Sequence, residues 1–500
     1  MTRRPASAIG LPLLEDITDA SGVAPLVETP LPAGARHRQL HARTLLIGMQ
    51  LALSGRRPAH LTEVHAALTS LPAADQQRLG VTEDWNDGPH QLTYRQIEHT
   101  HRLINRALAR TSPDGTPSPA LQHVCDALTE ASIPEAFKNA STSMAADWTD
   151  AGAWARPVRH QDAGSGTDPE AGWGHRNVGR TIEEGEMFFG YLLSAAVMVA
   201  DDNGPPVPEL ARRITAGSPR HDPAAALAAV LVTMAGAGAR LGDIIADSGY
   251  AHRVPATWAQ PLRAAGAQLV QDLHPNDRGP QGTHQGAIIA SGNLYCPKTP
   301  PALLQLIPLP PGAPAADTAG HDQQTAELAR YKLGVHAADD ADGYRRHTCP
   351  AVAGKIRCPL RPASMTLDRS RPEILTPPQH PPACCSQQTI TAGPGVAAKT
   401  RQKHDYPSRQ WRLSYRRRTS AERANATIKD TATSNIARGW CRLTGLTPIM
   451  LWTTCLLVTR NHRILAAFEA RQARDARRAA AGLPPKTRKR RRATPAATPP

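Results

Sequence analysis

A chain of 500 residues is too long for one ordinary hydrophobic core, so we expect two to four structural units. Apolar residues make up 40% of it, which excludes a wholly disordered protein, while 46 prolines predict long loops. Residues 401–500 hold 23 Lys and Arg against 5 Asp and Glu, whereas the first 400 hold 35 against 38, so the C-terminal part is the one expected to meet a polyanion such as nucleic acid.

The N-terminal residues 1–138 predict an all-helical domain. Four segments have helical periodicity and are separated by loops rich in Pro, Gly and Asp: Arg36–Leu53, His60–Leu71, Thr93–Ala109 and Ala120–Ala131. Helical domains of this kind often bind DNA. No recognition helix is evident here, so a scaffold is an equal interpretation.

Residues 139–290 change to a mixture of strands and helices. The expected strands are Ser141–Thr149, Met187–Ala200, Val207–Ala216, Leu241–Ala246 and Gln268–Leu273. Helices are expected at Ala224–Ala239 and Val254–Ala265. This order predicts the α/β class, with a mixed sheet flanked by helices.

The remaining 210 residues divide by composition into three parts. Residues 291–400 are crowded with Pro and hold five of the eight cysteines, which is typical of an insertion. Residues 401–475 return to helices, at Trp411–Thr431 and Pro448–Arg471. Residues 476–500 predict a basic, disordered tail, because six of the seven positions from 486 to 492 are Lys or Arg.

The most informative motif lies on the first of these C-terminal helices. Tyr415, Arg418, Glu422 and Lys429 stand at offsets 0, 3, 7 and 14, which on a helix fall within an arc of roughly 60°. A carboxylate between cations on one stripe suits a metal ligand beside groups that hold phosphates. The alternative is a surface helix with ordinary salt bridges.

The spacing Tyr-x2-Arg-x3-Glu-x6-Lys resembles a signature of bacterial insertion-sequence transposases, which have a DDE active site and a ribonuclease-H-like core. All four positions of the signature match. The resemblance implies that Glu422 is the third catalytic carboxylate. It also implies that Tyr415, Arg418 and Lys429 are accessory residues that contact DNA.

Two aspartates complete the expected triad. Asp247 follows the apolar run of residues 241–246 and precedes Ser-Gly-Tyr, similar to the second Asp of that family. Asp147 lies inside the first expected strand, where the family places its first Asp. Asp150 is the rival, since it stands three residues further on and suits the start of a turn. Phe189-Gly190-Tyr191 also resembles a family landmark, but the basic residue that usually follows it is missing.

These residues together predict a DNA transposase that cleaves transposon ends and transfers the strand into target DNA. Hard carboxylate oxygens suit Mg²⁺ or Mn²⁺, and two such ions serve phosphodiester cleavage. The expected ligands are Asp147, Asp247 and Glu422. The expected partners are double-stranded DNA and, by analogy, further copies of the chain. A non-catalytic DNA-binding relic and a nuclease without strand transfer are the alternatives.

Four basic residues of the tail are further candidates for phosphate contacts: Lys486, Arg488, Lys489 and Arg490. A solvated tail that only aids solubility is the alternative. No Gly-rich loop of the nucleotide-binding type occurs, so no nucleotide cofactor is expected. No secretory signal and no spanning apolar run is evident, which predicts a cytoplasmic, nucleoid-associated protein without a membrane partner.

The cysteines of the insertion suggest a second metal. Three of them precede proline, and the candidate ligands of a structural Zn²⁺ are Cys296, Cys349, Cys358 and Cys384. The sequence lacks a close Cys-x2-Cys pair, so buried free thiols are the alternative.

Overall fold

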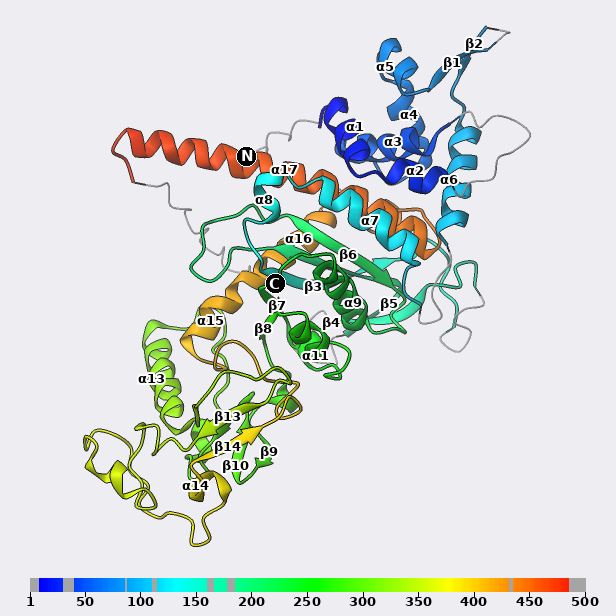
Figure 1. The fold of residues 1–500 in the computed structure, drawn as a ribbon. Helices are drawn as coiled ribbons and strands as arrows, with labels where there is room; N and C mark the ends of the chain where they lie inside the picture. The colour runs from blue at the N-terminus through cyan, green and yellow to red at the C-terminus, as the bar shows by residue number, and fades with distance from the viewer. Residues whose placement is uncertain are drawn as a thin grey trace, which may run out of the picture.

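The computed structural model describes residues 9–29, 40–85, 88–109, 115–159, 166–177, 185–430 and 435–484. Figure 1 shows three tiers: the N-terminal helices, a central sheet with helices on its faces, and a lower module built from the middle of the chain. The protein is therefore of the mixed α/β class.

The four predicted N-terminal helices are present, as α3 (Ala42–Ser54), α4 (Leu61–Thr69) and α6 (Tyr94–Leu108) in the upper tier and α7 (Pro119–Ala131) beside α17 (Leu446–Ala480) on the central sheet. Further helices are α1 (Leu11–Ala20), α2 (Val23–Glu28), α5 (Ala73–Arg78) and α8 (Glu135–Lys138). The expectation that this part is all-helical was wrong, because β1 (Thr82–Trp85) and β2 (Gly88–Gln91) pair as an antiparallel hairpin. The sequence Asn-Asp-Gly at positions 86–88 favours a hairpin over a helix.

The central sheet has six strands: β3 (Met144–Gly152), β4 (Gly172–Asn177), β5 (Gly185–Met198), β6 (Ala211–Gly217), β7 (Asp243–Ala246) and β8 (Gln268–Gln271). Its order is β4-β5-β3-β7-β8, with β6 paired to β5 beyond the end of β4. β5 runs antiparallel to β3, β4 and β6, whereas β3, β7 and β8 run parallel. All five predicted strands are present, and β4 was missed.

Each face of the sheet is covered by helices, because residues alternate between two apolar clusters. Ala145 of β3 packs in the cluster shared with α7, α16 (Thr419–Ile428) and α17 (Leu446–Ala480). Met144 and Ala146 pack in the cluster on the other face, with α9 (Pro223–Gly236) and α11 (Ala259–Ala264). Strands buried on both faces read as apolar runs, which is why the sequence revealed them.

The lower module begins earlier than the expected insertion. A three-stranded antiparallel sheet joins β9 (Pro280–His284), β10 (Ala287–Ala290) and β11 (Asn293–Tyr295), so position 291 lies within the β10–β11 hairpin. A second sheet joins β12 (Gly334–Val335), β13 (Arg345–Thr348) and β14 (Thr389–Ala392). The module also holds α12 (Pro301–Leu304), α13 (Ala315–Tyr331) and α14 (Ala383–Ser386). Two apolar clusters of its own stabilise it.

The chain returns to the sheet through α15 (Arg409–Tyr415), a 3₁₀ turn over Arg416–Arg418, and α16. The expectation of one continuous helix here was wrong. The Arg417 guanidinium donates hydrogen bonds to the carbonyl of Ala200 and to Asp243 at the start of β7. These contacts hold the segment in a tighter turn. The helix expected at Pro448–Arg471 is present as α17, which is longer at both ends.

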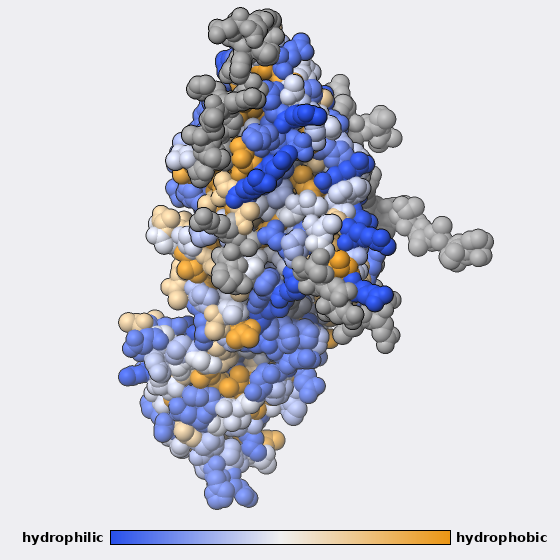
Figure 2. Space-filling view, turned by 90° about the vertical axis from the view of Figure 1, so that its right-hand side faces the viewer, coloured by the Kyte–Doolittle hydropathy of each residue, from blue (hydrophilic) through white to orange (hydrophobic). Residues whose placement is uncertain are grey.

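Among the described residues, no helix combines the length and apolar character that crossing a bilayer requires. On the face seen in Figure 2, hydrophilic residues cover most of the coloured surface and hydrophobic ones form separate patches.

Candidate active site

Asp147 and Asp247 lie on neighbouring parallel strands. Met144 pairs with Ile244 and Ala145 with Ile245, so the same offset brings Asp147 of β3 level with Asp247, the residue that follows β7. The two aspartates are therefore neighbours across the β3–β7 pair, with Asp147 inside β3 and Asp247 just beyond the carboxyl end of β7.

Glu422 comes to the same place from α16. The Arg418 guanidinium contacts both Glu422 Oε1 and Asp247 Oδ2, the latter at 3.4 Å. Arg418 is largely buried, with 16% of its side chain exposed, whereas half of the Glu422 side chain is exposed. One cation thus links two carboxylates that are 175 positions apart in the chain.

Asn425, three residues after Glu422, connects the helix to the first carboxylate. Its Nδ2 donates to Asp147 Oδ2 at 3.1 Å. Sequence reasoning missed Asn425, although its spacing from Glu422 places both on neighbouring positions of one helical face. Asp147 Oδ1 accepts the amide of Trp148 at 3.0 Å.

The electrostatics of Asp147 reflect this crowding. Burial is the main cause that raises its pKa to about 6, and the charges of Asp247 and Glu422 act in the same direction. Arg418 and the Asn425 hydrogen bond oppose them. The three carboxylates therefore form one interacting group with a guanidinium among them.

Asp247 is held by its own backbone turn. Its Oδ1 accepts the amides of Gly249 at 2.9 Å and Tyr250 at 3.4 Å, which caps the short α10 (Ser248–Ala251). Gly249 is required here, because a Cβ atom would lie 2.7 Å from the ring of Trp148. The Trp148 ring in turn lies against the buried Tyr250 ring in a tilted arrangement, with ring centroids 4.2 Å apart.

The other signature residues surround this group. Tyr415 ends α15 and stacks on Trp411, with ring centroids 4.8 Å apart. Burial raises the pKa of Tyr415, and the nearby charge of Arg418 opposes this. Lys429 closes α16 and binds Asp150 Oδ1 at 2.7 Å. Asp150 thus pairs with Lys429, while Asp147 contacts Asn425.

The carboxylate oxygens of Asp147, Asp247 and Glu422 do not lie as close to one another as the ligand atoms of a single metal ion. Of the residues that the structure describes, only His252, His274 and Asp277 bring three potential ligand atoms within 4.8 Å of one another. There the Lys399 ammonium already lies 2.8 Å from Asp277 Oδ1 and 3.2 Å from His252 Nδ1. That cation neutralises Asp277, which disfavours a metal at this position.

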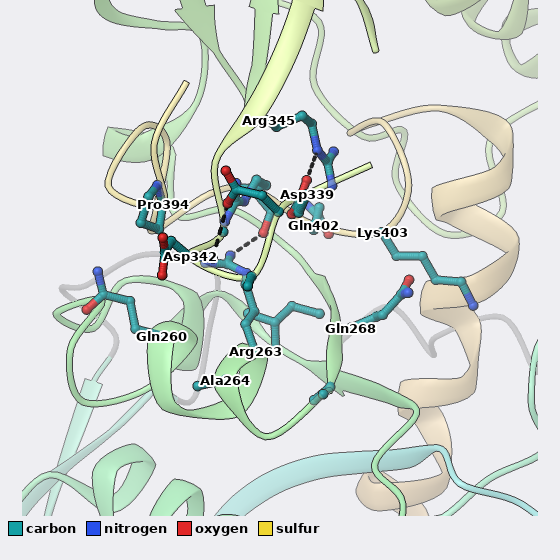
Figure 3. Close-up of a pocket in the computed structure, with 17 residues that line it drawn as sticks. Gln260, Arg263, Ala264, Gln268, Asp339, Asp342, Arg345, Pro394, Gln402 and Lys403 are labelled. Carbon is teal, nitrogen blue, oxygen red and sulfur yellow. Dashed lines mark hydrogen bonds and ion pairs between the residues drawn. The ribbon is translucent and has the colours of Figure 1, made fainter. Parts of the chain in front are cut away.

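A cavity of about 750 Å³ lies elsewhere, between α11 and the lower module (Figure 3). Polar and apolar groups share its lining, and two of its cations are paired: Arg345 bonds to Asp339, and Arg263 donates to the carbonyl of Ala398 at 2.6 Å. Burial, and next the charge of Arg401, lower the pKa of Arg263 to about 10. None of the triad carboxylates lines this cavity, and we assign it no chemistry.

The remaining predicted site residues fall in two places. Lys486, Arg488, Lys489 and Arg490 lie outside the described residues. Cys296, Cys349, Cys358 and Cys384 are buried in the lower module, where Cys384 Sγ lies 3.9 Å from Cys385 Sγ.

Comparison with known proteins adds no relative, since no family model and no curated protein matches this chain. Three carboxylates, from β3, the end of β7 and α16, interact around Arg418.

Proposed function

We propose that this protein is a DNA transposase of the DDE type, with a ribonuclease-H-like core and with Asp147, Asp247 and Glu422 as its catalytic carboxylates. The observation that carries the proposal is their common interaction with Arg418, from three elements far apart in the chain. An Asp on a central strand, an Asp after its parallel neighbour and a Glu on a following helix is the arrangement expected from the sequence motif.

The donor set fits magnesium or manganese. All three groups are carboxylates, the ligands that hard divalent cations prefer, and together they exceed the single charge of Arg418. Asp247 and Glu422 are also open to solvent, with 27% and 50% of their side chains exposed. A pair of such ions would supply activation of the attacking oxygen and stabilisation of the leaving oxygen. When two ions share three carboxylates, the three groups need not all be close enough to bind the same ion.

The protein's own side chains would hold the DNA for this reaction. Tyr415, Arg418 and Lys429 flank the carboxylates and present one aromatic ring and two cations, which suits a phosphodiester backbone. In hydrolysis, a water oxygen bonds to phosphorus and the transposon 3′ oxygen leaves as a hydroxyl. In strand transfer, that hydroxyl bonds to a target phosphorus and a target 3′ oxygen leaves. Two DNA ends and one target favour an assembly of several copies.

The test is a cleavage assay on linear DNA carrying the element's own ends, with Mg²⁺ and with or without target DNA. We expect Asp147→Asn, Asp247→Asn and Glu422→Gln each to lower cleavage by at least roughly 10³-fold. DNA binding, measured by gel shift without added metal, should stay within about threefold of the unsubstituted protein, since the basic residues are intact.

Asp150→Asn is the matched control, because it removes a carboxylate from the same strand that pairs with Lys429. It should retain most of the cleavage activity. Full cleavage by Asp247→Asn would overturn the proposal. Ends that are cut but never joined to target DNA would identify a nuclease, and binding without any cleavage would identify a relic.

A further inference from the structure

Five of the eight cysteines gather in the lower module. Cys296, Cys349 and Cys358 share one apolar cluster, and Cys384 and Cys385 belong to the adjoining one. All five are buried as free thiols, and Leu360 packs against both clusters. The two clusters therefore meet at Leu360, two residues after Cys358.

The strand registers explain why the cysteines converge. Tyr295 bridges to Lys332, Gly334 pairs with Thr348, and Thr348 pairs with Thr389. Cys296 directly follows Tyr295, and Cys349 directly follows Thr348. α14, which carries Cys384 and Cys385, ends three residues before Thr389. Segments up to 89 positions apart thus present their thiols at one end of the paired strands.

Three of the cysteines begin the same kind of turn, with proline next. The amide two residues on donates to Sγ in each case: Lys298 to Cys296, Ala351 to Cys349 and Leu360 to Cys358. The carbonyl of the cysteine also accepts an amide from the turn, at 3.0 Å in Cys296 and 2.9 Å in Cys358. Amides aimed at sulfur stabilise a thiolate that binds a metal.

The fourth thiol is identified by its neighbours. Cys385 interacts electrostatically with each of the three turn cysteines, and Cys384 does so with Cys296 and Cys349. Cys384 Sγ instead lies 3.6 Å from the position that a Cβ atom would take on Gly286, at the β9–β10 turn. The Cys384 thiol is thus placed beside the β9–β10 turn, which favours Cys385 as the fourth ligand.

We propose that Cys296, Cys349, Cys358 and Cys385 bind one structural Zn²⁺, with Cys384 outside the first shell of ligands. The sequence-based choice of Cys384 is thereby replaced by its neighbour. Four thiolates are a preferred ligand set of zinc, and Zn–S bonds of about 2.3 Å place sulfurs about 3.8 Å apart. The described thiols do not form a group of three within 4.8 Å, so binding draws them closer.

The site would fasten four segments of a Pro-rich module: the end of β11, the end of β13, the turn at Cys358, and α14. This inference is independent of the DNA chemistry, because its ligands are far from the carboxylates in sequence and belong to separate apolar clusters. Loss of zinc and loss of catalysis are consequently separable observations.

The experiment measures metal per chain in the full-length protein, purified with zinc in the growth medium and dialysed against metal-free buffer. We expect about one equivalent of zinc, and after replacement by Co²⁺ the absorption bands of a tetrahedral thiolate site. Cys349→Ser, Cys358→Ser and Cys385→Ser should each lower zinc below about 0.2 equivalents. Cys384→Ser and Cys455→Ser, the latter on α17, should retain it.

Cobalt absorption on the unsubstituted protein keeps the test decisive if a variant fails to fold. Zinc below about 0.2 equivalents together with absent cobalt bands would overturn the proposal. A disulfide between any of these cysteines, detected by mass spectrometry without reductant, would also overturn it. Zinc lost from Cys384→Ser but retained by Cys385→Ser would overturn the choice of the fourth ligand.

Discussion

At the scale of single residues, buried groups set the chemistry that this protein can support. Arg418 is held between carboxylates, and those charges together with Tyr415 keep its pKa above the ordinary value although burial opposes this. A permanently charged guanidinium at this point offsets repulsion among Asp147, Asp247 and Glu422. Substitution of Arg418 therefore disturbs all three carboxylates at once.

His101 gives a pH-dependent test of burial at the same scale. It lies on α6 with 7% exposure, and burial lowers its pKa from 6.5 to about 4. The unfolded chain binds the proton near pH 6.5 and the folded chain only near 4, so the free energy of unfolding falls as pH drops between these values. The free energy of unfolding should therefore fall between about pH 7.5 and about pH 5. We expect His101→Gln to remove about 1–2 kcal/mol of this fall, measured by urea unfolding.

His99 on the same helix is exposed and provides the control. His99→Gln should change the pH dependence of the free energy of unfolding by less than about 0.5 kcal/mol relative to the unsubstituted protein. An unchanged dependence in His101→Gln would contradict the assigned burial.

At the scale of elements, the pairing of β3 with β5 and β7 positions the site. The β3–β7 ladder brings the two aspartates level, and the β3–β5 ladder runs the full length of β3. α16 packs on the same strand and carries Glu422 and Asn425 toward it. A change in the β3–β5 register would move Asp147 away from the helix.

Gly190 tests this ladder. A Cβ atom there would lie 2.1 Å from the carbonyl oxygen of Ala151 and 2.9 Å from Gly152 Cα, which are backbone atoms of β3. We expect Gly190→Ala to lower the free energy of unfolding by more than about 3 kcal/mol, measured by urea unfolding. Gly236→Ala at the exposed end of α9, with open space around it, should raise it by up to about 1 kcal/mol. Equal changes in the free energy of unfolding for Gly190→Ala and Gly236→Ala would contradict the close pairing of β3 and β5 at Gly190.

At the scale of the whole molecule, the charge divides the chain unevenly. The excess of basic residues lies after position 400, and several of them are used internally, such as Arg417 and Lys403 on Asp243. The basic run 486–492 stands beyond these contacts in the sequence. Its expected role is to bind DNA phosphates without regard to base sequence.

Truncation of the chain tests that role. Removing residues 485–500 deletes six basic side chains, so the slope of log K against log salt should fall by up to about 5 in gel-shift titrations. Removing only residues 493–500, which carry no charge, should leave the slope unchanged. A slope that is the same in both truncations would show that the run does not contact DNA.

Much of the fold could be predicted because its signals are local. Apolar runs such as Ile244–Ala246 and the periodicity of α6 depend on neighbouring residues, which the sequence displays directly. The hairpin β1–β2, the strand β4 and the 3₁₀ turn before α16 were missed, since competing local signals or tertiary hydrogen bonds decide them.

The sequence by itself determined the chemical groups: carboxylates after strands, a Tyr-Arg-Glu-Lys stripe, cysteines followed by proline, and a basic C-terminus. Only the tertiary structure decided which of them meet. Arg418 between Asp247 and Glu422 and Asn425 on Asp147 both depend on chain segments brought together by sheet register and helix packing. Such contacts are set by burial and pairing across many residues, and a local pattern does not carry them.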